Sequence, residues 1–313
     1  MELSDDALRS IVAHLAHLRA EYGEVLENPD LVEPTGDYFP DEFALEPAAI
    51  ERLMRRMMTY APLASDLEVQ LGFVEPDAGT REGKAGGGCG SGACAPGDKS
   101  QTTMMSGAVE TEDGYAVVLA TADVGEPKIL TAALARSMGR LVLFEADEDV
   151  DPRVEGALSE LTAVACGLGV ILLGGASVYK KGCGGVRQHQ GTFLGVQELA
   201  LACALFVRAT DRKPGMVRRH LAVTQREAFD LALDWVDGQP KLVRALTNDP
   251  ASLADGIFLL EEKKGLLSRL LTRKRDDDMP DAIPISVKPK ERSEEERRRL
   301  AETRALVEEA LGE

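Results

Sequence analysis

The sequence predicts an α+β fold that is predominantly helical. Residues 4–27 place apolar side chains at helical spacing, and residues 129–144 and 191–208 carry long helical segments rich in alanine and leucine. A hairpin signal, the Asp113-Gly114 dipeptide, separates the apolar segments 107–110 and 115–122. We therefore expect many helices, with one small sheet or hairpin packed on the helix at 129–144.

Composition and charge restrict the class of protein. The chain has 313 residues with 44% hydrophobic content, which is enough for one large domain with appendages. A net charge of −17 argues against a nucleic-acid partner, because binding to the phosphate backbone needs a cationic surface. The acidic N-terminus lacks the pattern of a secretory signal, and five cysteines, an odd number, suit a reducing compartment. We expect a cytoplasmic protein.

Residues 1–30 predict an amphipathic N-terminal helix that docks or pairs. Ser4 or Asp5 is the expected N-cap. His14 and His17 lie one turn apart on this helix, a spacing that permits metal binding. No carboxylate or thiol partner is evident nearby in the sequence, so we interpret the two histidines as part of a solvated face. The apolar positions are Leu8, Ile11, Val12, Leu15 and Leu18.

Residues 31–238 predict the central domain. The second strand of the hairpin is apolar almost throughout, so we expect it to be buried against a helix. The apolar run 161–178 is interrupted by Thr162 and four glycines, which indicates a buried helix and its exit, not a membrane span. Cys166 and Cys203 lie in apolar helical runs and are expected in the core, and Trp235 is expected to pack at the end of a helix.

Two segments follow the central domain. Residues 239–275 predict a helical extension whose end, 263–275, is basic and amphipathic. This end can dock on a partner or on an anionic membrane surface, and membrane contact is not favoured because it has no aromatic anchor. Residues 276–313 predict a charged, proline-bearing linker that is expected to be flexible, then a terminal helix that begins at a capping box, Ser293 to Glu296.

The helix at 129–141 has the pattern of a zinc peptidase helix without its zinc ligands. Such a helix carries His-Glu-x-x-His, in which two imidazoles one turn apart bind zinc and the carboxylate acts as general base. In the matching register this chain has Arg136, Ser137 and Arg140. Guanidiniums are always protonated and offer no lone pair, so they cannot bind a cation.

The order of segments around this helix carries a resemblance over residues 31–238. Pro34-Thr-Gly-Asp-Tyr-Phe-Pro-Asp41 is followed by a helix, an irregular region at 75–103, a strand, the helix above, an inward-facing helix and an alanine-rich helix. In this order the chain resembles the zincin-like metallopeptidase domain of uncharacterised bacterial proteins. In such families the inward-facing helix supplies the remaining acidic metal ligand. The resemblance implies that Glu155 or Glu160 holds that position.

The resemblance implies two further expectations. Arg136 and Arg140 should face Glu155 or Glu160, so that a guanidinium replaces the metal charge and pairs with the surviving acid. We prefer this structural role to an anion-binding or catalytic role. In a working zincin the strand before the metal helix binds the substrate backbone by edge pairing, which needs no metal. A relative that has lost its zinc ligands can therefore keep the groove in which the peptide binds.

A glycine-rich run at 85–97 carries Cys89 and Cys94. This Cys-x4-Cys spacing permits a disulfide, a thiolate pair for a soft metal, or part of an iron–sulfur site. Cys183 and His189 are the candidate additional ligands, because both lie in glycine-flanked segments. The sequence has no Cys-x2-Cys pair, so we prefer a loop with incidental or redox-active thiols to a zinc or iron–sulfur site. We therefore expect no cofactor.

These observations favour a catalytically inactive zincin-like protein. We expect a binding or scaffold module that holds a protein or peptide partner in the inherited cleft, and not an enzyme. The alternative is a cysteine-dependent metal-binding or redox protein that uses Cys89, Cys94 and Cys183. A residual metal-dependent hydrolase is the third choice, because it requires a metal partner for Glu155 or Glu160 that the sequence does not reveal.

Overall fold

The computed structural model of the protein describes residues 3–26, 28–75, 106–112, 114–148, 150–182 and 185–260. It is mostly helical with a small three-stranded mixed sheet, which confirms the predominantly helical α+β fold. The helices are α1 Asp5–Glu21, α2 Gly23–Leu26, α3 Pro47–Met58, α4 Thr121–Val124, α5 Pro127–Glu145, α6 Glu155–Ala163, α7 Gly169–Gly175, α8 Val196–Ala209, α9 Pro214–Arg218, α10 Val223–Asp237 and α11 Pro240–Asn248. The strands are β1 Val69–Val74, β2 Gly107–Thr111, β3 Gly114–Ala120, β4 Val178–Gly182 and β5 Gly185–His189.

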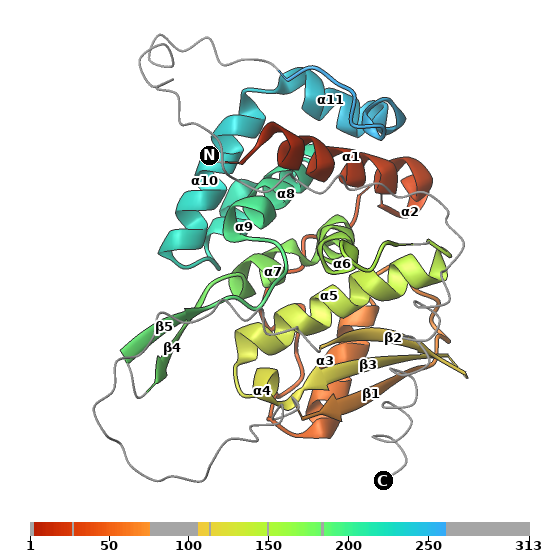
Figure 1. The fold of residues 1–313 in the computed structure, drawn as a ribbon, viewed down its shortest axis with the longest axis vertical. Helices are drawn as coiled ribbons and strands as arrows, with labels where there is room; N and C mark the ends of the chain where they lie inside the picture. Colours follow the sequence, from red (N-terminus) through yellow and green to blue (C-terminus); the bar gives the residue numbers. More distant parts are fainter. Residues whose placement is uncertain are drawn as a thin grey trace, which may run out of the picture.

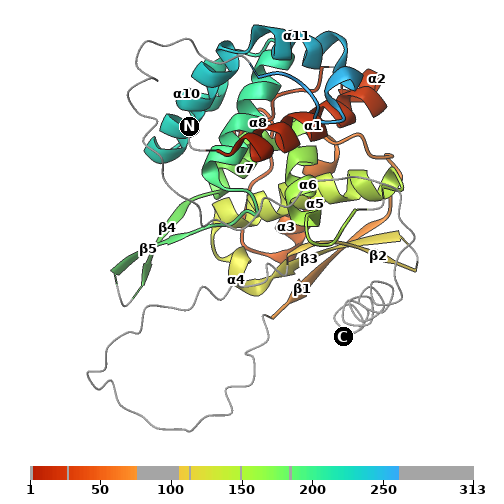
Figure 2. The same cartoon turned by 45° about the horizontal axis from the view of Figure 1, so that its top comes forward.

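Helix α5 lies in the middle of the molecule (Figure 1). The sheet of β1, β2 and β3 contacts one side of α5, while α6 and α7 pack on it from the other. Helices α1 and α8 cover α6 and α7, and α10 and α11 lie outside α8 (Figure 2). The hairpin of β4 and β5 projects from the body in both views. Helix α5 is therefore the element around which the other layers are arranged.

The sheet confirms the predicted hairpin and corrects one expectation. Strands β2 and β3 pair antiparallel, and β1, which the sequence analysis did not predict, pairs parallel with β3. The strand order is β1-β3-β2, so β3 has a neighbour on each side. Its backbone groups are already engaged, and the strand before α5 cannot offer an edge to a peptide.

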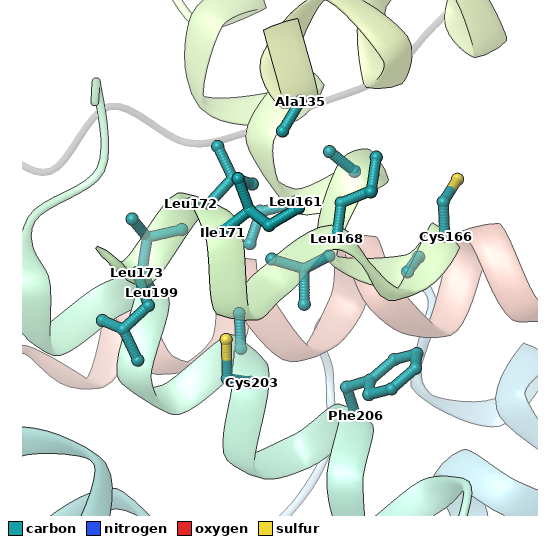
Figure 3. Close-up of a cluster of buried hydrophobic side chains, with 14 of the residues drawn as sticks. Ala135, Leu161, Cys166, Leu168, Ile171, Leu172, Leu173, Leu199, Cys203 and Phe206 are labelled. Carbon is teal, nitrogen blue, oxygen red and sulfur yellow. The ribbon is translucent and has the colours of Figure 1, made fainter. Parts of the chain in front are cut away.

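The apolar segment after residue 155 forms the core. The stretch Glu155–Gly175 is long and apolar enough to cross a membrane by composition, but 89% of its apolar 18-residue segment is buried inside the structure. Figure 3 shows Leu168, Ile171 and Leu172 of this stretch between Ala135 of α5 and Cys203 of α8. The buried-helix interpretation is thus confirmed, and Cys166 and Cys203 are buried as expected.

A break at Gly167 divides this apolar stretch. The segment Val164–Leu168 is a π-helical turn between α6 and α7, and Gly167 has a φ of 89°. A Cβ on Gly167 would lie 1.9 Å from the carbonyl oxygen of Asp30, and the Val32 amide donates a hydrogen bond to the Gly167 carbonyl. Only glycine tolerates both this φ and this close approach. The continuous helix expected here is therefore two helices, with the chain at Asp30 packed against the turn.

Helix α1 docks on the same core. Ser4 is its N-cap as predicted, since its Oγ accepts a hydrogen bond from the Ala7 amide at 3.2 Å. The apolar face of α1 and the buried leucines of α11, Leu242 and Leu246, belong to one hydrophobic cluster with α5, α7 and α8. The segments 263–275 and 276–313 and most of 75–103 lie outside the described residues.

Candidate functional site

Close packing of α5 on α6 places Arg136 and Arg140. Gly139 stands at the contact, where a Cβ would lie 1.9 Å from the Ser159 carbonyl oxygen. The missing side chain lets the two helix backbones approach. Arg136 and Arg140, one turn apart on α5, then face the acidic residues of α6.

The first pair joins Arg136 to Glu160. Arg136 Nη1 lies 3.4 Å from Glu160 Oε1, and the two side chains are 4% and 0% exposed. The Phe193 and Leu194 amides each donate a hydrogen bond of 2.8 Å to a different carboxylate oxygen of Glu160. Both oxygens of Glu160 are therefore engaged by groups of the protein itself.

The guanidinium of Arg136 is held on its other sides. Its Nη2 donates to the Ser106 carbonyl oxygen at 2.8 Å and its Nη1 to the Gly191 carbonyl oxygen at 3.3 Å. The ring of Phe193 covers it at 5.2 Å. Ser106 in turn donates to Asp123 at 2.7 Å. Both side chains are therefore enclosed by the residues that the structure describes.

The second pair is closer to the surface. Arg140 Nε lies 2.9 Å from Glu155 Oε1, and its guanidinium stacks on the Phe144 ring at 4.1 Å. Ser137, between the arginines, is buried and donates its hydroxyl to the Ala133 carbonyl oxygen at 2.9 Å. The expected pairing of the arginines with Glu155 and Glu160 is confirmed.

Burial controls the titration of Glu160. It raises the pKa of this carboxyl to about 7, although the Arg136 charge and the two backbone amides act in the opposite direction. The pair therefore sets the Arg136 guanidinium against a carboxyl whose charged form is disfavoured by burial.

Among the other candidate ligands, the structure places only His189. Cys89, Cys94 and Cys183 lie outside the described residues. His189 is exposed at the end of β5, opposite Val178 of β4, in a hairpin that the sequence analysis treated as a loop. Within the described ranges, no group of three His, Cys, Asp or Glu side chains could hold a metal ion.

The two histidines of α1 correct another expectation. His14 is buried, with Nε2 3.3 Å from the Thr162 hydroxyl, and His17 Nε2 lies 3.1 Å from Glu148 Oε1. The interpretation of a solvated face is wrong, because the partners Thr162 and Glu148 are distant in sequence and only the fold brings them to α1.

Burial, followed by the nearby His17 charge, lowers the pKa of His14 to about 3. Thr162 donates its hydroxyl proton to the Leu158 carbonyl oxygen, so its oxygen accepts from His14 Nε2. His14 Nδ1 then has no hydrogen bond to any described residue. Protonation would bury a charge there. The hydrogen bond to Glu148 raises the pKa of His17, and the same bond lowers the pKa of Glu148.

An open pocket of about 400 Å³ lies elsewhere in the fold. Its walls come from the segment 34–43, from α3, from the first turns of α5 and from α7. Most of the lining is apolar, and the main contributors are Phe39, Phe43, Leu53, Met57, Val170 and Ile171. Pockets of this size and character bind ligands or partner side chains. The four residues of the arginine pairs do not line it.

The rim of this pocket carries polar side chains. His220 is fixed by Glu33, whose Oε2 lies 2.8 Å from His220 Nε2 and also accepts from Arg219 Nε at 2.7 Å. Lys128 and Thr131 stand on the first turns of α5. The sequence analysis singled out the segment from Pro34 to Asp41 only for its resemblance and missed that it forms a pocket wall. No periodic pattern marks such a wall, because its other parts come from distant segments.

Comparisons with protein-family models, with curated proteins and with solved structures find no match to this chain.

The buried pair predicts strong energetic coupling. Arg136→Met should lower the free energy of unfolding by about 3–5 kcal/mol at about pH 8, because it leaves the Glu160 carboxylate buried without its counter-charge. In the double variant with Glu160→Gln the loss should be smaller than the sum of the single losses, with a coupling of about 1–3 kcal/mol. Urea denaturation of the four proteins measures this coupling.

The control cycle uses an exposed ion pair. Arg208 Nε lies 2.6 Å from Asp237 Oδ1, with side chains 32% and 50% exposed. Arg208→Met and Asp237→Asn should couple by less than about 1 kcal/mol. Additive losses for Arg136 and Glu160 would contradict a charge-dependent role for their contact.

The low pKa of His14 predicts how the free energy of unfolding changes with pH. Its folded pKa of about 3 lies below the ordinary 6.5, so it contributes stability above pH 6.5 that is lost as the pH falls toward 3. From about pH 7.5 to about pH 5, His14→Gln should therefore gain about 2 kcal/mol of unfolding free energy relative to the native chain. The two proteins are compared at each pH because Glu160 acts in the opposite direction. Its raised pKa makes the folded chain less stable as the pH rises through this range.

His17→Gln is the matched control. The raised pKa of His17 contributes stability that is present below its ordinary value and lost as the pH rises, so this variant should lose stability relative to the native chain at low pH. If the free energy of unfolding changes equally with pH in the native chain and in His14→Gln, the account of a neutral, buried His14 is contradicted.

Proposed function

We propose that this chain is a catalytically inactive zincin-like protein that acts as a binding module for a protein or peptide partner. The observation that supports the loss of catalysis is the sealed contact between Arg136 and Glu160. Arg136 occupies the position of the first metal-binding histidine in the register of the resemblance. Its guanidinium pairs with an acidic residue of α6, where the remaining ligand of the family would be.

The same geometry argues against residual hydrolysis. A catalytic zinc site needs three protein ligands and an open position for water. Glu160 accepts hydrogen bonds from two backbone amides and contacts Arg136, and Glu155 contacts Arg140. Ser137 stands at the position of the general base, and its hydroxyl is bound to the helix backbone. These contacts support a role in holding α5 against α6.

The binding role is assigned to the open pocket. An inherited cleft at Arg136 is closed by Phe193, whereas the pocket of α3, α5 and α7 is open and mostly apolar. Apolar pockets with a few polar groups at the rim are common anchor points for partner side chains. We therefore place the partner at this pocket. The cysteine-dependent alternative rests on residues outside the described ranges and gains no support from the described contacts.

Selection of peptides by phage display on the full chain tests this function. Thr131→Trp should fill the pocket and abolish binding of the selected peptides, because Thr131 lines it from α5. Thr247→Trp is the matched control and should bind normally. Thr247 is an exposed threonine of α11 whose hydroxyl donates to its own helix backbone. Mass spectrometry should recover every bound peptide intact, with or without added zinc.

Two results would contradict the proposal. Chelator-sensitive cleavage of peptides by the native chain would restore the hydrolase alternative. Binding that is unchanged by Thr131→Trp would exclude this pocket as the site of the partner.

A further inference from the structure

A second hollow lies beside the proposed partner pocket, and charged side chains line most of it. It has a volume of about 340 Å³ and is formed by α3 together with Asp41. Three arginines of α3, Arg52, Arg55 and Arg56, line it. Two acids, Asp41 and Glu51, also line it, so the hollow has one more positive than negative side chain in a chain whose net charge is −17.

Helix α3 carries the two hollows on neighbouring faces. Its residues Ala49, Leu53 and Met57 line the apolar pocket, whereas the cationic hollow is formed by the face that carries Arg52 and Arg55. These sets follow the spacing of adjacent stripes on one helix. A ligand that crosses α3 would therefore meet an apolar face and a cationic face in succession.

Arg56 stands at the boundary and lines both hollows, as does Asp41. Arg56 Nη2 lies 3.2 Å from Asp41 Oδ2, with side chains 39% and 43% exposed. An ion pair with this exposure contributes little stability and exchanges readily with water or a ligand. A guanidinium offers five donors, and a single contact with Asp41 leaves capacity for another carboxylate.

The other two arginines are also accessible. Arg52 is exposed and makes no ion pair with the part of the chain that the structure describes. Arg55 donates to the Val69 carbonyl oxygen at 2.8 Å and lies 3.8 Å from Glu51, an exposed pair along the same helix. Arginine forks match carboxylates bidentately. The hollow thus suits an acidic group.

Apolar side chains extend the other hollow onto the surface. Phe43, which lines the apolar pocket, is 45% exposed, and Leu45 in the same segment is 54% exposed. Aromatic and arginine side chains are the residue types enriched at protein interfaces. The surface that runs from Phe43 across Arg56 to Arg52 is broader than one pocket and favours a peptide over a single small acid.

We propose, building on the proposed function, that the partner presents a linear segment in which an acidic side chain lies next to large apolar side chains. The apolar side chains enter the pocket between α3, α5 and α7, and the acidic side chain binds at Arg52 and Arg56. The ion pair between Arg56 and Asp41 sets the boundary between the two. Charge at the second hollow selects the segment, while burial in the first supplies most of the affinity.

Fluorescence anisotropy of labelled synthetic peptides with the full chain tests this assignment. The probe carries two glutamates followed by a leucine and a phenylalanine. One control peptide has lysines in place of the glutamates, and another has serines in place of the apolar pair. The probe should bind saturably and each control should bind at least about tenfold more weakly.

Matched variants locate the acidic contact. Arg52→Glu should weaken binding of the probe by about tenfold or more, and it should strengthen binding of the lysine peptide. Arg244→Glu removes a similarly exposed arginine of α11 and should leave both affinities unchanged. Because Arg52 is exposed, the variant should fold, which circular dichroism checks.

Four outcomes would overturn the assignment. They are absence of probe binding, equal binding of the lysine peptide, saturation by dodecanoate in place of the peptide, and equal affinity for a peptide copied from residues 276–287, which would make this chain's own tail the occupant. If phage display still selects peptides that require an open pocket at Thr131, the binding function stands and only the acidic specificity fails.

Discussion

The contact between Arg136 and Glu160 is the constraint on which the rest of the structure depends. Two charges removed from water are tolerated only when every remaining donor and acceptor is satisfied. Here the partners come from the segment before β2 at Ser106, from Gly191, and from the amides of Phe193 and Leu194. Helix α5, helix α6, the sheet and the segment before α8 must therefore all be in position at once. This explains why a polar contact stands at the centre of an otherwise apolar interface.

That constraint also determines where a partner can bind. Gly139 lets α5 and α6 approach until their side chains enclose Arg136 and Glu160. The opposite end of α5 is different, because its first turns meet α3, α7 and the segment 34–43 around an open pocket. The arginine pairs and the open pocket are thus separated along one helix. In our proposal the arginine positions became a structural contact, while the pocket remained accessible to a partner.

The sequence could predict the elements whose signals are local. The hairpin at Asp113-Gly114 and the cap at Ser4 follow from turn and capping chemistry. The pairing of Arg136 and Arg140 with α6 is expected from the resemblance to the order of helices in zincin-like domains. Three features could not be predicted, because they depend on distant segments. The parallel strand β1 lies between long stretches without a periodic pattern, and the partners of His14 and His17 are distant in sequence. The pocket is formed by five separate segments. The helix break at Gly167 is an intermediate case, since a glycine is visible in the sequence but the approach of Asp30 that requires it is not.

Reconstruction of the metal site is the most direct test that the arginines occupy metal-ligand positions. Arg136→His with Arg140→His places two imidazoles one turn apart on α5, beside Glu160 and Glu155, the acids that the two arginines contact. Elemental analysis and calorimetry of the folded double variant should find about one equivalent of zinc, and adding Glu160→Gln should weaken its binding at least about tenfold. A folded double variant that binds no zinc, or whose zinc affinity ignores Glu160, would contradict the account.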